Sequence, residues 1–259
     1  MLEEIMGANA SPWDLYDRMI AGIPRGIAVL DYCLGLHWAY VEAESGIGIS
    51  HTLRGGGSPT LSGDPRDLDL RSLAELSKSW DFIEATLGIA ALNAWYSQLS
   101  RLEGLGALID WENQKGSLEG DPFKALREDY SGKNVTVIGH FPHVEQMAEY
   151  CNLTVLERNC TSPVDVPDPA AEYIIPEQDY LFMTGTTLQN KTAPRLLELG
   201  KNTITVMVGP STVPCEPIAN AGVQVLSGSV VVDAEEAKLA VRGGNKMQWR
   251  RGIKKFMLR

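Results

Sequence analysis

Residues 132–143, GKNVTVIGHFPH, decide the fold of this 259-residue chain. A continuous run of β-branched and apolar residues ends at Gly139, and the bulkier residues His140, Phe141 and Pro142 follow it. This pattern predicts the first strand of a Rossmann-like, doubly wound α/β unit, with a ligand-facing turn at the carboxyl end of the strand. The turn departs from the G-x-G-x-x-G pattern, because His140 and Phe141 stand where a dinucleotide fold needs small glycines. We therefore do not expect this turn to bind NAD in its usual pose.

Two later strand ends repeat this pattern. Residues 180–184 (YLFMT) run into Gly185, and residues 203–208 (TITVMV) run into Gly209. Because the carboxyl ends of parallel strands lie along one edge of a sheet, the three turns should open onto one crevice. Hydroxyl groups beside free backbone N–H groups at the start of a helix suit an anion such as a carboxylate or phosphate. The alternative is that each Ser or Thr only caps its helix. In these two later turns, the residues that we expect to contact a ligand are Thr184, Gly185, Thr186, Thr187, Gly209, Pro210 and Ser211.

The second predicted strand, residues 153–157, ends in an acid, Glu157. This acid lies about twenty residues after the first turn, where a Rossmann domain places the carboxylate that binds ribose hydroxyls. An enzyme that uses a nucleotide or S-adenosylmethionine is therefore an open alternative. A solvated surface position for Glu157 is the other interpretation.

His140 is the candidate metal ligand. Neutral imidazole is the commonest metal ligand in proteins, so His140 together with Cys160, Glu157 or a carboxylate from the first half of the chain could bind a divalent metal ion. The spacing to His143 matches no known metal signature, and Pro142 between them disturbs a shared helix face. A hydrogen-bonding or general acid–base role for His140 at the crevice is the competing hypothesis.

The three turns, taken with residues 84–94 (EATLGIAALNA), closely resemble the heavy-metal chelation family. This is a family of uncharacterised prokaryotic proteins. The resemblance covers nearly the whole chain. It implies an enolase N-terminal-like α+β domain over residues 1–125, a Rossmann-like domain over residues 130–259, and a site in the cleft between the two domains. It also implies that this site binds a heavy metal or a small anionic metal chelate and uses Asn93, His140, Thr184 and Ser211.

The first half of the chain has its own pattern. Residues 26–34, 36–43 and 49–53 predict an antiparallel meander, with a turn over residues 45–48. Two helices should follow over residues 69–78 and 80–99, and residues 103–122 should form a linker. Asn93 lies in an apolar stretch of the second helix, so its amide must find hydrogen-bond partners or face a cleft.

Charge and composition limit the class of protein. The formal net charge of −10 arises in residues 1–129, which carry 20 acidic and 10 basic residues. Such an acidic body argues against nucleic-acid binding. No apolar stretch is long enough to span a bilayer, and the four cysteines form no C-x-x-C pair, so we expect a cytoplasmic protein with reduced thiols and no membrane partner.

The last residues reverse the charge. Residues 238–259 contain 8 basic residues and no acidic one. This segment could meet an acidic partner or a neighbouring subunit, which keeps a non-catalytic scaffold and a homo-oligomer open as alternatives. A solvated helix and terminal strand would carry the same charges.

Overall fold

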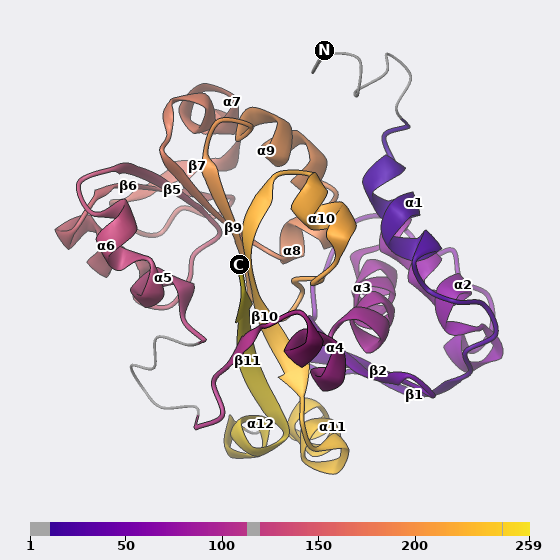
Figure 1. Cartoon of the computed structure of the whole chain (residues 1–259). Coiled ribbons are helices and arrows are strands. Elements are labelled where there is room, and N and C mark those ends of the chain that lie inside the picture. Colours follow the sequence, from indigo (N-terminus) through magenta and orange to yellow (C-terminus); the bar gives the residue numbers. More distant parts are fainter. Residues whose placement is uncertain (1–10, 113–119, 245) are drawn as a thin grey trace.

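The computed structural model describes residues 11–112, 120–244 and 246–259, and it is a mixed α/β protein with two separate sheets (Figure 1). The first sheet has three antiparallel strands in the order β1-β2-β3, which confirms the predicted meander. Its strands are β1 (Val29–Leu34), β2 (Trp38–Ala43) and β3 (Gly46–His51).

The predicted turn over residues 45–48 is wrong at its end, because β3 begins at Gly46. Gly46 pairs with Ala43, so the connection is only two residues long. Gly48 marks a close approach instead of a turn: a Cβ atom there would lie 2.1 Å from the carbonyl oxygen of Ala90 in helix α3 (Phe82–Tyr96). A glycine inside a strand pattern can thus report tight strand–helix packing.

Helices surround the small sheet. Asp81 caps α3 by accepting a 2.9 Å hydrogen bond from the backbone N–H of Glu84, and residues 84–94 of this helix are all buried. The predicted helix over residues 69–78 is divided into an α-helical and a 3-10 part. The helical elements of this half are α1 (Asp14–Ala21), η1 (Pro65–Asp67), α2 (Leu70–Ala74), η2 (Glu75–Lys78), α3 and α4 (Leu99–Gly104).

The second sheet has eight strands in the order β4-β11-β10-β9-β8-β5-β6-β7. The run from β7 to β10 is parallel, while β11 and β4 are antiparallel to their neighbours. If the six parallel strands are numbered 1 to 6 in chain order from β5 to β10, their order across the sheet, starting at β7, is 3-2-1-4-5-6. Doubly wound nucleotide-binding sheets have this order, which confirms the α/β class. The strands are β4 (Leu108–Ile109), β5 (Asn134–Ile138), β6 (Asn152–Glu157), β7 (Asp165–Pro167), β8 (Tyr180–Thr184), β9 (Ile204–Val208), β10 (Val223–Val231) and β11 (Ile253–Leu258).

Short helices connect these strands. They are α5 (Pro122–Ala125), α6 (Arg127–Tyr130), η3 (Val144–Glu149), η4 (Asp168–Ala170), α7 (Ala171–Ile174), η5 (Ile175–Glu177), α8 (Thr186–Gln189), α9 (Ala193–Leu199), α10 (Glu216–Asn220), α11 (Ala234–Gly243) and α12 (Lys246–Gly252). Within the described residues, no helix combines the length and the apolar character needed to cross a bilayer.

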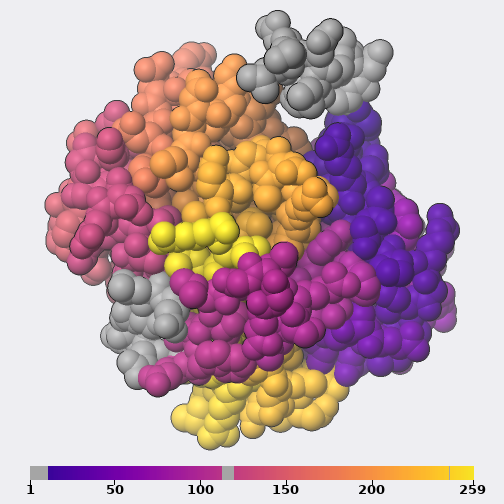
Figure 2. All heavy atoms as spheres, viewed as in Figure 1, coloured from indigo at the N-terminus to yellow at the C-terminus, as the bar shows by residue number. Residues whose placement is uncertain are grey.

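The two halves of the chain share one apolar core. A single buried cluster contains Tyr16 and Leu92 from the first half and Met183 and Phe256 from the large sheet. Figure 2 shows the indigo and magenta N-terminal half packed directly against the orange C-terminal half. The predicted linker is partly wrong, because β4 lies inside it and pairs with β11. The domain division at residues 125–130 stays a prediction.

Part of the basic C-terminal segment pairs with the acidic first half. Lys238 Nζ lies 3.2 Å from Glu42 Oε2, and Arg242 Nη2 lies 2.6 Å from Asp31 Oδ2. These ion pairs join α11 to the small sheet. Some of the charge that the sequence offers to a partner is therefore used within the chain.

Candidate ligand-binding cavity

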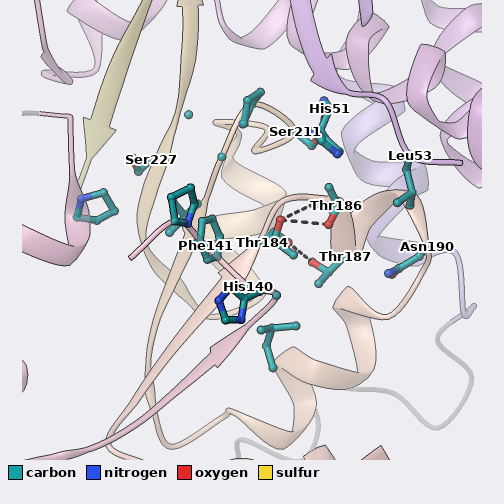
Figure 3. Close-up of a pocket in the computed structure, with 18 of the residues that line it drawn as sticks. His51, Leu53, His140, Phe141, Thr184, Thr186, Thr187, Asn190, Ser211 and Ser227 are labelled. Atoms are coloured by element: carbon teal, nitrogen blue, oxygen red, sulfur yellow. Dashed lines mark hydrogen bonds between the residues drawn. The ribbon is translucent and has the colours of Figure 1, made fainter. Parts of the chain in front are cut away.

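A cavity of about 860 Å³ lies at the carboxyl ends of β5, β6, β8 and β9 (Figure 3). Part of its lining comes from β2 and β3, so both halves of the chain contribute to it. Nine of the eleven predicted site residues line it: His140, Phe141, Glu157, Thr184, Thr186, Thr187, Gly209, Pro210 and Ser211.

The other two predicted residues, Asn93 and Gly185, lie outside the lining. Asn93 is 1% exposed, and its amide nitrogen donates to the carbonyl oxygens of Ile49 at 2.8 Å and Pro210 at 3.1 Å. Gly185 lies so close to the turn after β9 that a Cβ atom would stand 2.4 Å from the backbone nitrogen of Thr212. Asn93 therefore joins that turn to β3, and Gly185 lets two strand-end turns pack against each other.

The turn after β8 presents hydroxyl groups to the cavity. Thr184 Oγ1 and Thr186 Oγ1 are 3.1 Å apart, and the backbone N–H of Thr186 points to Thr184 Oγ1 at 3.3 Å (Figure 3). The hydroxyl of Thr187 donates to the carbonyl oxygen of Thr184 at 2.7 Å. Because a hydroxyl has one proton and two lone pairs, Thr184 and Thr186 retain hydrogen-bonding capacity for a ligand, while Thr187 has already used its proton.

The turn after β9 is held by a buried hydrogen-bond network, which we call the Ser211 network. The Ser211 hydroxyl accepts from the backbone N–H of His51 at 2.9 Å and donates to Gln189 Oε1 at 3.0 Å. Gln189 Nε2 donates to the carbonyl oxygen of His51 at 2.7 Å and to Thr86 Oγ1 at 2.8 Å. Ser211 and Gln189 are 1% and 0% exposed, so this network fixes the position of β3 against the large sheet.

His140 lies between two carboxylates at the end of β5. Its Nδ1 is 3.0 Å from Asp165 Oδ1, and its Nε2 is 2.9 Å from Glu145 Oε1. Its backbone N–H also donates to Glu157 Oε2 at 3.0 Å. Burial alone would lower the pKa of His140, but the hydrogen bonds and charges of Asp165 and Glu145 outweigh burial and raise the pKa.

Both ring nitrogens of His140 thus face carboxylates, and two such acceptors favour the ring that carries a proton on each nitrogen. Cys160, its predicted co-ligand, donates from Sγ to the carbonyl oxygen of Glu157 at 3.6 Å. Across the described ranges, no group of three or more His, Cys, Asp or Glu side chains is arranged to hold a metal ion. Metal coordination by His140 stays a prediction.

His51 is the main cavity residue that sequence reasoning missed. In the β2–β3 ladder His51 is directly opposite Trp38, so their side chains share one face of the small sheet, and both line the cavity. Burial, and then the charge of His37, lower the pKa of His51, so its ring is neutral at neutral pH. The alternation of side chains along β3 could have indicated its orientation, because Ile47, Ile49 and His51 project from the same face of the strand and His51 is the last of them.

Other missed residues come from the last strands and helix. Ser227 and Ser229 of β10, Trp249 of α12 and Lys255 of β11 line the cavity, and Lys255 is directly opposite Ser229 in the β10–β11 ladder. The Trp38 and Trp249 rings pack together with centroids 4.0 Å apart. No local motif marks these positions, because the sheet order alone brings β10 and β11 beside β9.

Lys191 stands in the sequence between the lining residues Asn190 and Thr192 but is not itself part of the lining. Its ammonium group donates to the carbonyl oxygens of Gln189, at 2.6 Å, and Ser79. Burial lowers the pKa of Lys191 to about 8. The lysine therefore joins the segment after α8 to the first half of the chain.

Comparison with known proteins agrees with this architecture. Residues 121–258 match the model of the DUF364 family, whose description is "Putative heavy-metal chelation", and residues 16–96 match a second model, DUF4213, with the same description. The chain belongs to this family, which confirms the resemblance seen in the sequence.

Three relatives of the chain are described as uncharacterised or of unknown function. A crystal structure of a DUF364 protein with unknown function from Desulfitobacterium hafniense DCB-2 has a TM-score of 0.82 and 33% identity, over 95% of this chain and 98% of that chain. A second such structure, from Pyrococcus horikoshii, has a TM-score of 0.75 at 21% identity, over 94% and 97% of the two chains, and shows the fold alone. An uncharacterised protein of Methanocaldococcus jannaschii is 28% identical in an alignment of 251 positions, which covers 89% of this chain and 89% of that protein.

Proposed function

We propose that the chain binds a small organic anion, free or as its metal chelate, in the cavity at the carboxyl edge of the large sheet. The observation that supports this most is the meeting of the turns after β5, β8 and β9 on one cavity of about 860 Å³. That volume lies in the range of roughly 300–1,000 Å³ typical of small-molecule sites. The description of the family supports a metal as part of the ligand.

The lining suits an anion with several oxygens. Thr184 and Thr186 offer hydroxyls at one end, and Lys255 and Ser229 offer an ammonium group and a hydroxyl at another. Both ring nitrogens of His140 already face carboxylates, and the Ser211 hydroxyl is used in its network. A donor set of hydroxyls and cations fits carboxylate or phosphate oxygens better than a bare metal ion, so the ligand itself would bring most of the metal donors.

Tryptophan fluorescence tests this proposal, because Trp38 and Trp249 line the cavity. The protein would be titrated with citrate, oxalate, iminodiacetate and phosphate, with Ni²⁺ and Cu²⁺ ions, and with preformed chelates. Thr184→Val, which removes a hydroxyl but keeps the shape, should weaken binding about tenfold. Thr154→Val, on β6 outside the cavity, is the matched control and should bind like the wild type. The lack of any saturable response would refute the proposal.

An enzyme that uses a nucleotide or S-adenosylmethionine is the second candidate. Glu157 favours it, because this acid ends β6, the neighbour of β5, and lines the cavity. Its carboxylate also accepts from the backbone N–H of Arg158 at 2.7 Å, so a ribose would share an occupied acceptor. Native mass spectrometry should then detect a co-purifying nucleotide or a mass shift with added cofactor, and the lack of both would exclude this candidate.

A further inference from the structure

The chain has four histidines, and two of them, His51 and His140, line the cavity. Both ring nitrogens of His140 face carboxylates. The ring of His51 forms no hydrogen bond to any residue that the structure describes. His51 is therefore the imidazole of the cavity that has a nitrogen lone pair available to a ligand.

The backbone, and not the ring, fixes the position of His51. Its N–H donates to Ser211 Oγ at 2.9 Å, and its carbonyl oxygen accepts from Gln189 Nε2 at 2.7 Å. Figure 3 shows the ring beside Ser211. Trp38 lies directly opposite His51 in the β2–β3 ladder, so the two side chains project from the same face of the small sheet. The side chain is thus placed at the cavity without using either ring nitrogen.

Neutral imidazole is the form that binds metals such as Cu²⁺, Ni²⁺ and Zn²⁺, and burial keeps His51 in this form by lowering its pKa. One imidazole binds a bare ion weakly. An ion already held by a small chelator, however, has only a few positions left, and these are filled by water.

We propose that His51 completes the coordination of a metal ion that enters the cavity as the chelate of a small carboxylate. A ring nitrogen of His51 displaces one water molecule from the metal, while the hydroxyl groups of Thr184 and Thr186 bind the chelator. This inference rests on the proposed function, because the cavity must first accept the chelate.

Copper(II) iminodiacetate is a suitable probe, since its visible absorption band moves to shorter wavelength when an imidazole nitrogen replaces water. The wild type should produce a saturable shift together with quenching of tryptophan fluorescence. His51→Gln should lose the shift and bind the chelate at least about tenfold more weakly. His37→Gln and His143→Gln, which change histidines outside the cavity lining, are matched controls and should keep the shift.

The same titrations separate this inference from the proposed function. Metal-free iminodiacetate should bind His51→Gln as it binds the wild type, whereas Thr184→Val should weaken binding of both chelator and chelate. A retained shift in His51→Gln, or equal affinity of the wild type for the bare ion and the chelate, would overturn the inference alone. If neither anion nor chelate binds the wild type, both ideas fail.

A second variant protects the test against a folding defect in His51→Gln. Trp38→Phe should keep the absorption shift but reduce the quenching, because Trp38 is the cross-strand neighbour of His51. Unchanged quenching in Trp38→Phe would place the metal elsewhere and would also overturn the inference.

Discussion

The two histidines of the cavity are held in opposite ways. His51, on β3, is fixed through its backbone by the Ser211 network and has a neutral ring without a hydrogen-bond partner among the described residues. His140, at the end of β5, also donates its backbone N–H to Glu157, but its ring is held as well, because it lies between Asp165 and Glu145, which raise its pKa. One residue thus keeps its side chain for a ligand, while the other uses its side chain to hold the turn.

This difference depends on how far away the partners lie in the sequence. Ser211 is 160 residues from His51, whereas Asp165 and Glu145 are 25 and 5 residues from His140. A strand-end position predicts that a residue reaches the cavity edge. Whether its side chain is free depends on which other segments the fold brings to it.

The largest effect should follow from breaking the Ser211 network. Gln189→Met keeps the size of the side chain but removes three buried hydrogen bonds, to Ser211, to Thr86 and to the carbonyl oxygen of His51. We expect the free energy of unfolding to fall by about 2–4 kcal/mol, because three buried hydrogen bonds are lost and each contributes roughly 1 kcal/mol. Urea denaturation measures this loss.

The control for that change is Gln146→Met, which replaces an exposed glutamine on η3. It should change stability by less than about 0.5 kcal/mol. Equal stability of Gln189→Met and Gln146→Met would show that the Ser211 network does not hold β3, and His51 would then lose the backbone anchor that distinguishes it from His140.

The second effect concerns the contact between the turns after β8 and β9. Gly185→Ala would place a Cβ atom 2.4 Å from the nitrogen of Thr212 and 2.5 Å from the carbonyl carbon of Ser211, so one turn must move. We expect a loss of about 2–3 kcal/mol in thermal or urea unfolding. Gly104→Ala, where nothing lies within 4 Å of the added atom, should be neutral or slightly stabilising. A neutral Gly185→Ala would mean that Ser211 can move without disturbing the fold.

Local patterns in the sequence were sufficient for most of the architecture. The strands around Val137, Phe182 and Val206 are continuous apolar runs that end at Gly139, Gly185 and Gly209, and such runs predict buried parallel strands whatever surrounds them. The two-residue strand β4 is different. Leu108 and Ile109 carry no strand signal of their own and become a strand because β11 lies beside them.

The residues of the candidate site likewise fall into those that a local pattern predicts and those that depend on tertiary packing. Thr184, Thr186 and Ser211 were predicted because each lies at or shortly after the carboxyl end of a strand of the parallel sheet. His51 and Trp249 were not, because their place at the cavity depends on how the small sheet and α12 pack against the large sheet. No local spacing in the sequence marks His51 or Trp249 as a residue of the cavity.

The third prediction concerns ligand affinity on the His140 side. His140→Gln removes the imidazole that lies between Asp165 and Glu145 and leaves both carboxylates without its positive charge, next to a position that lines the cavity. Binding of a small anion such as citrate should weaken about tenfold, measured by fluorescence titration, because two carboxylates then repel it. His143→Gln, outside the cavity lining, should leave the affinity unchanged. An unchanged affinity in His140→Gln would restrict this histidine to holding the turn.

The smallest effect is the pH dependence of stability, in which the two histidines should have opposite signs. The pKa of His140 is raised in the folded state, so its stabilisation is complete below its unfolded pKa of about 6.5 and is lost as pH rises through the folded pKa. The pKa of His51 is lowered, so the unfolded state takes up a proton first and stability falls as pH drops below about 6.5.

Melting temperatures of single variants separate these two contributions, which oppose each other in the wild type. Between pH 5.5 and 7.5, His140→Gln should lose stability at the acidic end relative to the wild type, because the favourable cation is gone. His51→Gln should gain stability at that end, because the unfavourable proton uptake is gone. Each difference should amount to about 1–2 °C. Differences of the same sign in both variants would show that the two rings do not have opposite charge states. The contrast drawn between His51 and His140 would then be wrong.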